Sequence, residues 1–220
     1  MIILNDILLI VGAYLLGSIP SAVWIGKYFY DIDVREHGSG NAGATNTIRV
    51  LGKKAGIPVL IIDALKGLAA VLIAGYSSYE RGSTEFINLQ LVLGIAAVIG
   101  HIFPVFAAFK GGKGIATLLG ITIAINPVAS LISIVTFFTV LLIFNYVSLS
   151  SISAAVIYPI TIIYILKIKA LSLIVFSFLV AVMVIVTHKK NIERLLKREE
   201  PKANWFKRKN NQEDNSSNNS

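Results

Sequence analysis

Residues 38–49, with the sequence GSGNAGATNTIR, are the part of this chain whose residue types best suit chemistry. The glycines allow a tight backbone loop that can present its N–H groups to a ligand. Arg49 adds a planar guanidinium, which suits phosphate or carboxylate. An otherwise apolar chain does not need such a segment to span a membrane, so we interpret it as a binding loop for an anionic ligand.

A second candidate segment, residues 109–117, has the sequence FKGGKGIAT and precedes an apolar run. Glycines that lead into a helix N-terminus leave N–H groups unpaired at the positive end of the helix dipole, which is an anion-binding arrangement. Lys110 and Lys113 add positive charge. The segment is not a P-loop, because Gly114 follows Lys113 where that motif has Ser or Thr. Phosphate binding is the favoured interpretation, and a flexible basic turn against lipid headgroups is the alternative.

The third candidate segment, residues 188–196, has the sequence HKKNIERLL and follows the last apolar run. On a helix, His188 and Asn191 would share one face. Histidine has an ordinary pKa of about 6.5 and can hold or move a proton near neutrality, although a structural role for His188 is an equal alternative. The closely spaced charges from Asn191 onward predict a short amphipathic helix at the membrane interface. His188 and Asn191 are therefore better site candidates than Glu193 or Glu199.

Asp63 and Lys66 lie inside an apolar run, where each charge would cost roughly 2.5–3.5 kcal/mol at the centre of a bilayer. Their spacing lets them pair on one helix face. We predict a structural ion pair that faces the interior of the helix bundle. The alternative is that the pair holds the residues of the site in position without contacting a ligand. His101, near the end of another apolar run, is assigned a structural or supporting role.

The composition of the chain identifies the elements that must position these residues. Of the 220 residues, 55% are hydrophobic and 15% are charged, whereas a soluble domain has about a quarter charged residues. The mean hydropathy is +0.73 and the apolar residues form long blocks, so we predict an all-α, polytopic integral membrane protein. The net charge of +8 comes from residues that flank these blocks, which favours positive charge beside a membrane over nucleic-acid binding.

Chemistry that depends on other residue types is excluded or disfavoured. The absence of cysteine excludes disulfides, thiol nucleophiles and thiolate metal sites. The sequence contains no clustered carboxylates or histidines for a metal, no evident Ser-His-Asp set and no cofactor motif. Glycines, amides and hydroxyls beside Arg49, Lys113 and His188 are better suited to holding phosphates and stabilising negative charge than to supplying a covalent nucleophile.

A membrane-spanning helix needs roughly 20 mostly apolar residues. We predict about seven spans, at about residues 3–27, 55–76, 87–107, 115–125, 128–147, 151–166 and 170–187. The division at Asn126-Pro127 follows because proline removes a backbone donor and favours a turn; six spans, with one kinked helix over 115–147, are the alternative. Residues 1–200 then form one transmembrane domain, and residues 201–220 form a polar, disordered tail.

The distribution of Lys and Arg predicts the orientation. In the arrangement with seven spans, residues 27–54, 108–114, 148–150 and those after 187 share one side, which holds most of the basic residues. The other side holds only Arg81, Lys167 and Lys169. The positive-inside rule therefore places the N-terminus outside and the C-terminus in the cytoplasm. All three candidate segments then lie on the cytoplasmic side, as one active site requires, whereas six spans would separate the third segment from the others.

The three segments together resemble the motifs of the bacterial acyl-phosphate:glycerol-3-phosphate acyltransferase family. The resemblance rests on SGNAGATN at residues 39–46 with Arg49, on KGGKGIAT at 110–117 and on HxxNIxRLL at 188–196, in the same order and spacing. It covers about residues 10–200 and includes GSI at 17–19, DxxKG at 63–67, GHxxPVF at 100–106 and YVSL at 146–149.

The resemblance implies an enzyme of the bacterial cytoplasmic membrane, with seven spans and a cytoplasmic active site. It would transfer an acyl chain from acyl phosphate to the 1-hydroxyl of glycerol 3-phosphate, giving lysophosphatidic acid and inorganic phosphate as the first step of phospholipid synthesis. A substrate phosphate would take the hydroxyl proton, without a covalent acyl-enzyme. The expected partners are these substrates and membrane lipid, without nucleic acid or cofactor. A transporter or channel for a phosphorylated solute is the alternative.

The resemblance also implies roles for individual residues, with His188 and Asn191 as supporting polar groups and no residue as a nucleophile. The residues expected to hold glycerol 3-phosphate are Ser39, Arg49, Lys113, His188 and Asn191. Those expected around the head of acyl phosphate are Gly40, Asn41, Gly43, Thr45, Asn46, Gly111, Gly112 and Gly114. We assign Asp63, Lys66 and His101 a supporting role, next to the residues that contact the substrates.

Overall fold

The computed structural model describes residues 2–203, and the regular structure within this range is entirely helical. The helices are α1 (Ile2–Gly17), α2 (Ser21–Tyr30), α3 (Ala44–Leu51), α4 (Lys53–Leu72), α5 (Thr84–Ile102), α6 (Ile115–Ile125), α7 (Pro127–Phe144), α8 (Val147–Ile160), α9 (Leu171–Thr187) and α10 (Lys189–Leu196). Short helical turns lie at Val34–Glu36, Ile73–Tyr76 and Val105–Ala107, and a π-helical turn at Thr161–Ile165 extends α8. Residues 204–220, most of the predicted tail, lie outside the described residues.

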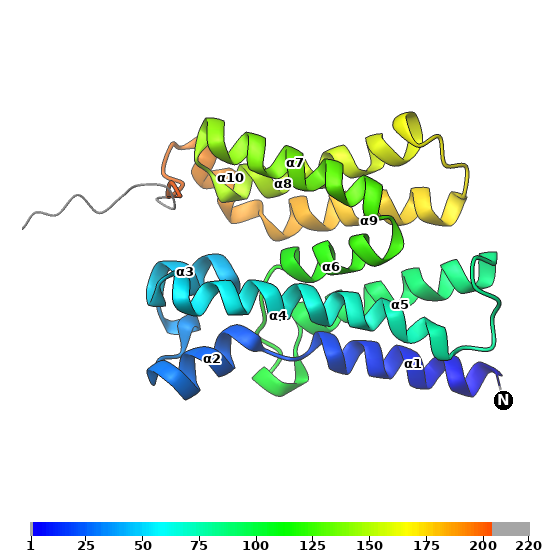
Figure 1. The fold of residues 1–220 in the computed structure, drawn as a ribbon. Coiled ribbons are helices and arrows are strands. Elements are labelled where there is room, and N and C mark those ends of the chain that lie inside the picture. The colour runs from blue at the N-terminus through cyan, green and yellow to red at the C-terminus, as the bar shows by residue number, and fades with distance from the viewer. Residues whose placement is uncertain (1, 204–220) are drawn as a thin grey trace, which may run out of the picture.

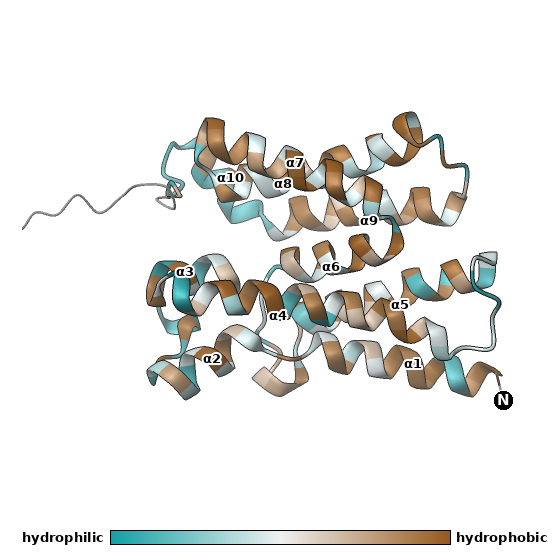
Figure 2. Cartoon of the chain, in the orientation of Figure 1, coloured by the Kyte–Doolittle hydropathy of each residue, from teal (hydrophilic) through white to brown (hydrophobic). Residues whose placement is uncertain are grey.

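The length and composition of the helices confirm an all-α, polytopic membrane protein. With their terminal turns, α4, α5, α7 and α8 are each long and apolar enough to cross a bilayer. The bent pairs α1/α2 and α9/α10 bring such crossings within residues 2–203 to six at most, and α6 is a shorter apolar helix. Figure 2 shows apolar residues along the helices and polar residues gathered toward the ends of the bundle. The number of seven spans stays a prediction.

Proline explains two breaks in the apolar stretches. The span expected at 3–27 is divided into α1 and α2, bent by 41°, because Pro20 lacks a backbone N–H and disfavours helical geometry at Ile19. At the start of α7, Oδ1 of Asn126 accepts a hydrogen bond from the backbone N–H of Ala129 at 2.9 Å, and Pro127 is the first helical residue. The chain reverses direction there (Figure 1), so the alternative of one kinked helix over 115–147 is wrong.

The bundle has two layers with α6 between them (Figure 1): α1, α2, α4 and α5 form one, and α7, α8 and α9 form the other. Glycines let α4 and α6 approach until their backbones meet. A Cβ on Gly67 would lie 2.1 Å from the carbonyl oxygen of Thr117, and a Cβ on Gly120 would lie 1.8 Å from that of Ala64. These contacts hold the first turns of α6 beside α4, and thereby position the segment that precedes α6.

The two ends of the described chain lie at opposite ends of the bundle (Figure 1). The end that carries α3 and α10 is called the polar end, and the start of α1, marked N, lies at the other (Figure 1). Ala203 lines the same cavity as Arg49 of α3 and Asn191 of α10. An odd number of crossings requires this separation. Which end faces the cytoplasm stays a prediction.

Candidate active site

A cavity of about 990 Å³ brings the three candidate segments together at the polar end. The predicted site residues that line it are Ser39, Gly40, Asn41, Gly43, Thr45, Asn46, Arg49, Asp63, His101, Lys113, Gly114, His188 and Asn191. Lys66, Gly111 and Gly112 do not line it. The three segments therefore form one site, although they are far apart in the sequence.

The N-termini of α3 and α6 both border the cavity, through Ala44 and Ile115. The first N–H groups of a helix have no partner within the helix and carry the positive end of its dipole, so they attract anions. Gly114, directly before α6, has φ of +79°, a conformation that favours glycine. Arg49 and Lys113 line the same cavity with full positive charges. This arrangement can hold phosphate groups.

Asn46 shapes the loop of residues 38–46 with its whole side-chain amide. Nδ2 donates to the backbone carbonyls of Val34 at 2.7 Å and His37 at 3.0 Å. Oδ1 accepts from the backbone N–H of Ser39 at 2.8 Å and from its hydroxyl at 3.1 Å. These bonds use both amide hydrogens and both lone pairs, so Asn46 orients the loop and Ser39. Its contact with acyl phosphate stays a prediction.

Gly111 and Gly112 attach the second segment to the end of α5. Their backbone N–H groups donate to the carbonyls of Ile102 at 3.1 Å and His101 at 3.2 Å, respectively. A Cβ on Gly111 would lie 1.9 Å from the carbonyl oxygen of His101, and a Cβ on Gly112 would lie 2.4 Å from Nε2 of its ring. Both positions therefore require glycine, and the N–H groups that suit an anion are those at the start of α6.

Lys113 is joined to the third segment by a chain of hydrogen bonds. Its Nζ donates to Oδ1 of Asn191, and Nδ2 of Asn191 donates to Oε1 of Glu200 at 2.7 Å. Nε of Arg194 pairs with Oε2 of Glu200 at 2.8 Å. Burial would raise the pKa of Glu200, but the hydrogen bonds from Asn191 and Arg194 outweigh it and lower that pKa. The ionised Glu200 thus orients Asn191 toward Lys113.

Glu200 is a site residue that the sequence did not predict. It lies in a run of charged residues, KREE at 197–200, which looks uniformly solvated. The chain turns back after α10, and the backbone N–H of Ala203 donates to the carbonyl of Asn145 at 2.7 Å. This turn buries the Glu200 side chain to 6% exposure. Pro201, which cannot continue a helix, is a signal that could have pointed to it.

Burial alters two of the basic groups that line the cavity, Lys113 and His188. Burial, with repulsion from Arg194, lowers the pKa of Lys113 to about 8 against the attraction of Glu200. Burial and the nearby Lys113 lower the pKa of His188 to about 4, so its ring is neutral at pH 7. Nδ1 of His188 lies 2.8 Å from the carbonyl oxygen of Val184, which can only accept. Nδ1 therefore carries the proton, and Nε2 is left as an acceptor.

Asp63 and Lys66 form the ion pair predicted from their spacing, with 2.8 Å between Oδ1 and Nζ. Oδ1 of Asp63 also accepts from the Ser21 hydroxyl at 2.8 Å, and Nζ of Lys66 donates to the carbonyl of Ile19 at 2.7 Å, in the break between α1 and α2. Nδ1 of His101 lies 3.7 Å from Oδ1 of Asp63. The ion pair therefore links α4 to the break between α1 and α2, and Asp63 also lines the cavity.

Among residues 2–203, no three His, Cys, Asp or Glu side chains are grouped to hold a metal ion.

Away from the polar end, the cavity continues along α6, α7, α8 and α9 and becomes apolar. The residues that line it there include Leu118, Leu119, Phe137, Ala155 and Val180. Tyr158 on α8 and Ser133 on α7 are the lining residues of those helices farthest from the polar end, and their hydroxyls lack a hydrogen-bond partner in the described structure. The cavity therefore suits a ligand with an anionic head and an apolar chain.

Comparison with known proteins agrees with these features. Residues 7–198 match the family model described as glycerol-3-phosphate acyltransferase. The chain is 43% identical over 203 residues to the glycerol-3-phosphate acyltransferase of Staphylococcus aureus (strain Newman), an alignment that covers 91% of this chain and 98% of the relative. It is 42% identical over 202 residues to that of Staphylococcus haemolyticus (strain JCSC1435), with the same coverage.

The fold is also similar to that of solved structures of PlsY (YgiH), an integral membrane glycerol 3-phosphate acyltransferase. The glycerol 3-phosphate form has a TM-score of 0.81 and 38% sequence identity, and the match covers 90% of this chain and 94% of that chain. The lysophosphatidic acid form has a TM-score of 0.78 and 36% identity, with the same coverage. Together with the three segments at one cavity, these matches show that the chain belongs to the glycerol-3-phosphate acyltransferase family.

Proposed function

We propose that this protein transfers an acyl chain from acyl phosphate to the 1-hydroxyl of glycerol 3-phosphate, with lysophosphatidic acid and inorganic phosphate as products. The observation that carries the proposal is a single cavity with two helix N-termini, Arg49 and Lys113 at one end and apolar walls at the other. Such a cavity suits two phosphate-bearing reactants, one of which has a hydrocarbon chain. A transporter for a phosphorylated solute would use the same charges but would not need the apolar part.

Arg49 and Lys113 bind the phosphate of glycerol 3-phosphate in this proposal, because charge-assisted hydrogen bonds are the strongest available to an anion. The Ser39 hydroxyl donates to Asn46, so its lone pairs can accept a hydrogen bond from a glycerol hydroxyl. The loop that Asn46 shapes therefore sets the position of Ser39 relative to the substrate.

His188 and Asn191 complete the polar wall around glycerol 3-phosphate. Neutral His188 accepts a hydrogen bond through Nε2, because Nδ1 is already bonded to Val184. A base with a pKa of about 4 is weak at neutral pH, which supports a binding role for His188 over an obligate role as general base. Asn191 faces Lys113 because Glu200 holds its amide.

The head of acyl phosphate lies in this proposal against the starts of α3 and α6, and its chain follows the apolar walls. The proposed contacts that line the cavity are Gly40, Asn41, Gly43, Thr45 and Gly114. Asn46, Gly111 and Gly112 contribute through the shape of their loops.

The reaction needs no protein nucleophile, because acyl phosphate is an activated mixed anhydride. The hydroxyl oxygen of glycerol 3-phosphate attacks the acyl carbonyl carbon and forms the new ester bond. The bond between that carbon and the phosphate oxygen breaks, and the hydroxyl proton passes to a substrate phosphate. The helix N-termini and Lys113 stabilise the negative charge on the departing phosphate. No cofactor takes part.

We place the enzyme in the bacterial cytoplasmic membrane, with the N-terminus outside and the polar end in the cytoplasm. The excess of Lys and Arg in the loops of the polar end supports this orientation. The separation of the start of α1 from α10 also supports it, because an odd number of crossings places the chain ends on opposite sides (Figure 1).

The test is a product assay with purified protein in lipid nanodiscs. With acyl phosphate and glycerol 3-phosphate, we expect inorganic phosphate and lysophosphatidic acid to appear, and we expect acyl-CoA not to replace acyl phosphate. Phosphate release no greater than in a protein-free control would overturn the proposal. Uptake of glycerol 3-phosphate by proteoliposomes without product would favour the transporter instead.

The proposed role of His188 has its own test. His188→Ala should leave measurable turnover, because it removes a binding group and not the group that takes the proton. Complete loss of turnover in a variant with unchanged thermal stability would instead assign His188 the role of an obligate base.

A further inference from the structure

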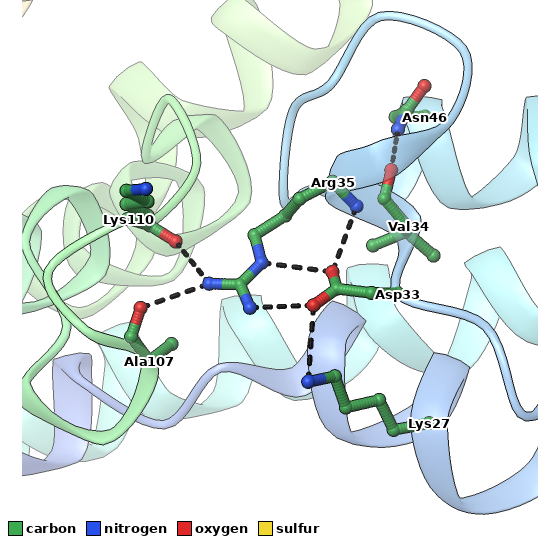
Figure 3. Close-up of polar contacts among 7 residues, drawn as sticks. All are labelled: Lys27, Asp33, Val34, Arg35, Asn46, Ala107 and Lys110. Carbon is green, nitrogen blue, oxygen red and sulfur yellow. Dashed lines mark hydrogen bonds and ion pairs between the residues drawn. The ribbon is translucent and has the colours of Figure 1, made fainter.

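Arg35 joins two loops that lead into the site from different parts of the sequence (Figure 3). Its Nη1 donates to the backbone carbonyl of Ala107 at 3.0 Å and lies 3.4 Å from that of Lys110. Arg35 lies just before the loop of residues 38–46, and Ala107 and Lys110 lie just before Gly111–Gly114. One guanidinium therefore spans the approaches to both proposed phosphate-binding loops.

Asp33 holds the guanidinium of Arg35 in place. Nε of Arg35 donates to Oδ1 of Asp33 at 2.9 Å, and Nη2 donates to Oδ2 at 2.7 Å (Figure 3). Such a bidentate pair is geometrically specific. The hydrogen bonds from Arg35 hold the pKa of the Asp33 carboxyl well below its usual range, so the pair stays ionised at neutral pH. Lys27 also contacts Asp33, at 3.2 Å, but its side chain is 55% exposed.

The turn that Arg35 contacts has an uncommon backbone. Ala108 and Phe109 have φ of 52° and 57°, in the left-handed region that side chains with a Cβ disfavour. Such a turn persists when surrounding contacts hold it. The backbone N–H of Phe109 donates to the carbonyl of Pro104 at 2.9 Å, and Arg35 contacts the carbonyls on both sides of the two residues.

The same short segment is also tied to the first loop. Val34, adjacent to Arg35, accepts a hydrogen bond from Nδ2 of Asn46 at 2.7 Å through its carbonyl (Figure 3). Val34 is fully buried. Residues 33–35 thus contact the loop of residues 38–46 on one side and the turn before Gly111 on the other.

We propose that Arg35 is a positioning residue, which holds the loops of residues 38–46 and 110–114 at the separation that places Lys113 and Ser39 around one glycerol 3-phosphate. The proposal rests on the proposed function. Arg35 does not line the cavity, so it acts through the loops and not on the substrate.

The direct test is the kinetics of Arg35→Gln, which keeps much of the side-chain volume and removes the charge and the fork. We expect the KM for glycerol 3-phosphate to rise about tenfold or more, and kcat to fall by less than about threefold. Arg35→Lys should give an intermediate KM, because an ammonium keeps the charge but cannot bind Asp33 and Ala107 in the same planar geometry.

A double-mutant cycle tests whether Asp33 acts through Arg35. We expect Asp33→Asn to raise the KM for glycerol 3-phosphate as well. The double variant with Arg35→Gln should have a KM no higher than that of Arg35→Gln alone, because both changes break the same contact between the loops. Lys27→Gln is the matched control. It removes the other cation on Asp33, which does not reach the turn at 107–110, and should change KM by less than about twofold.

An unchanged KM in Arg35→Gln would overturn the proposal, and so would a loss of kcat and thermal stability together without a change in KM. If Arg35→Gln does not fold, Arg35→Lys and Asp33→Asn must show the rise in KM for the proposal to stand. These outcomes differ from a failure of the proposed function, in which the unaltered protein would itself form no lysophosphatidic acid.

Discussion

The polar end of the cavity and its apolar inner part differ in how their polar atoms are hydrogen-bonded. At the polar end, Lys113, Asn191 and Glu200 form a continuous chain of hydrogen bonds. In the inner part, the hydroxyls of Tyr158 and Ser133 have no partner within residues 2–203, although the side chain of Tyr158 is only 1% exposed. The polar end is therefore held by specific bonds, whereas the inner part is shaped mainly by side-chain volume.

This difference separates two kinds of recognition. Fixed charges and helix N-termini select a phosphate group by direction and charge. An apolar wall selects a chain by length and width, and its free energy scales with the area buried. Changes at the polar end should therefore alter the KM for glycerol 3-phosphate, and changes in the inner part should alter the preference among acyl chains.

Removing a positive charge from the polar end should have the largest effect. A hydrogen bond to a charged group contributes about 1.5–3 kcal/mol, so Arg49→Ala and Lys113→Ala should each raise the KM for glycerol 3-phosphate about ten- to a hundredfold. Initial rates at varied glycerol 3-phosphate measure this. The control is Arg81→Ala, in the connection between α4 and α5, which lies at the end of the bundle opposite α3 and α10 (Figure 1). Unchanged KM values in both site variants would remove these roles.

The pH dependence should show the next largest effect. Burial lowers the pKa of Lys113 to about 8, so the charged form is present below pH 8 and is lost as the pH rises through that value. The KM for glycerol 3-phosphate should then rise by up to about tenfold for each pH unit above 8. Lys113→Ala should lack this dependence. The same slope in Lys113→Ala would mean that another group titrates.

Loosening the chain of hydrogen bonds should have a smaller effect at the polar end. Glu200→Gln removes the negative charge that Arg194 and Asn191 share, so Asn191 should lose its orientation and the KM for glycerol 3-phosphate should rise about five- to tenfold. Glu199→Gln, a change at the exposed neighbour, is the matched control. Equal effects of the two variants would contradict the assignment of Glu200 to the site.

A change in the inner part should have the smallest effect on overall rate but should alter acyl selection. Tyr158→Ala opens space, so acyl phosphates with longer chains should gain relative to shorter ones, at about 0.8 kcal/mol for each additional buried methylene. Tyr158→Phe keeps the ring and should keep the preference. Competition between acyl phosphates of different length measures the ratio. A shifted KM for glycerol 3-phosphate, with no change in chain preference, would show that the two parts are not separate.

The fold could be predicted where helices follow from apolar length and proline. The expected helices at 115–125 and 170–187 agree with α6 and α9. The span expected at 3–27 corresponds to α1 and α2, which are together long and apolar enough to cross a bilayer but are bent by 41° at the break that contains Pro20. A tertiary contact at this break could not be predicted. Lys66, far along the sequence, donates to the carbonyl of Ile19 that the break leaves exposed.

The site could be predicted as a set of residues but not as a set of contacts. The types of Arg49, Lys113 and His188 indicated anion binding, and the cavity brings them together. The sequence could not indicate that the Asn46 amide forms hydrogen bonds within its own loop, or that the backbone N–H of Gly111 donates to α5. These bonds form only after the loops have folded.

By itself, the sequence determined that this protein is a helical membrane protein with three segments whose residue types suit anion binding. Apolar length, proline positions and side-chain chemistry are local properties that can be read along the chain. Only the tertiary structure decided that Arg35 joins two loops, that Glu200 enters the site, and that the cavity extends to Tyr158. The physical reason is that each of these features depends on which distant segments pack side by side in the bundle.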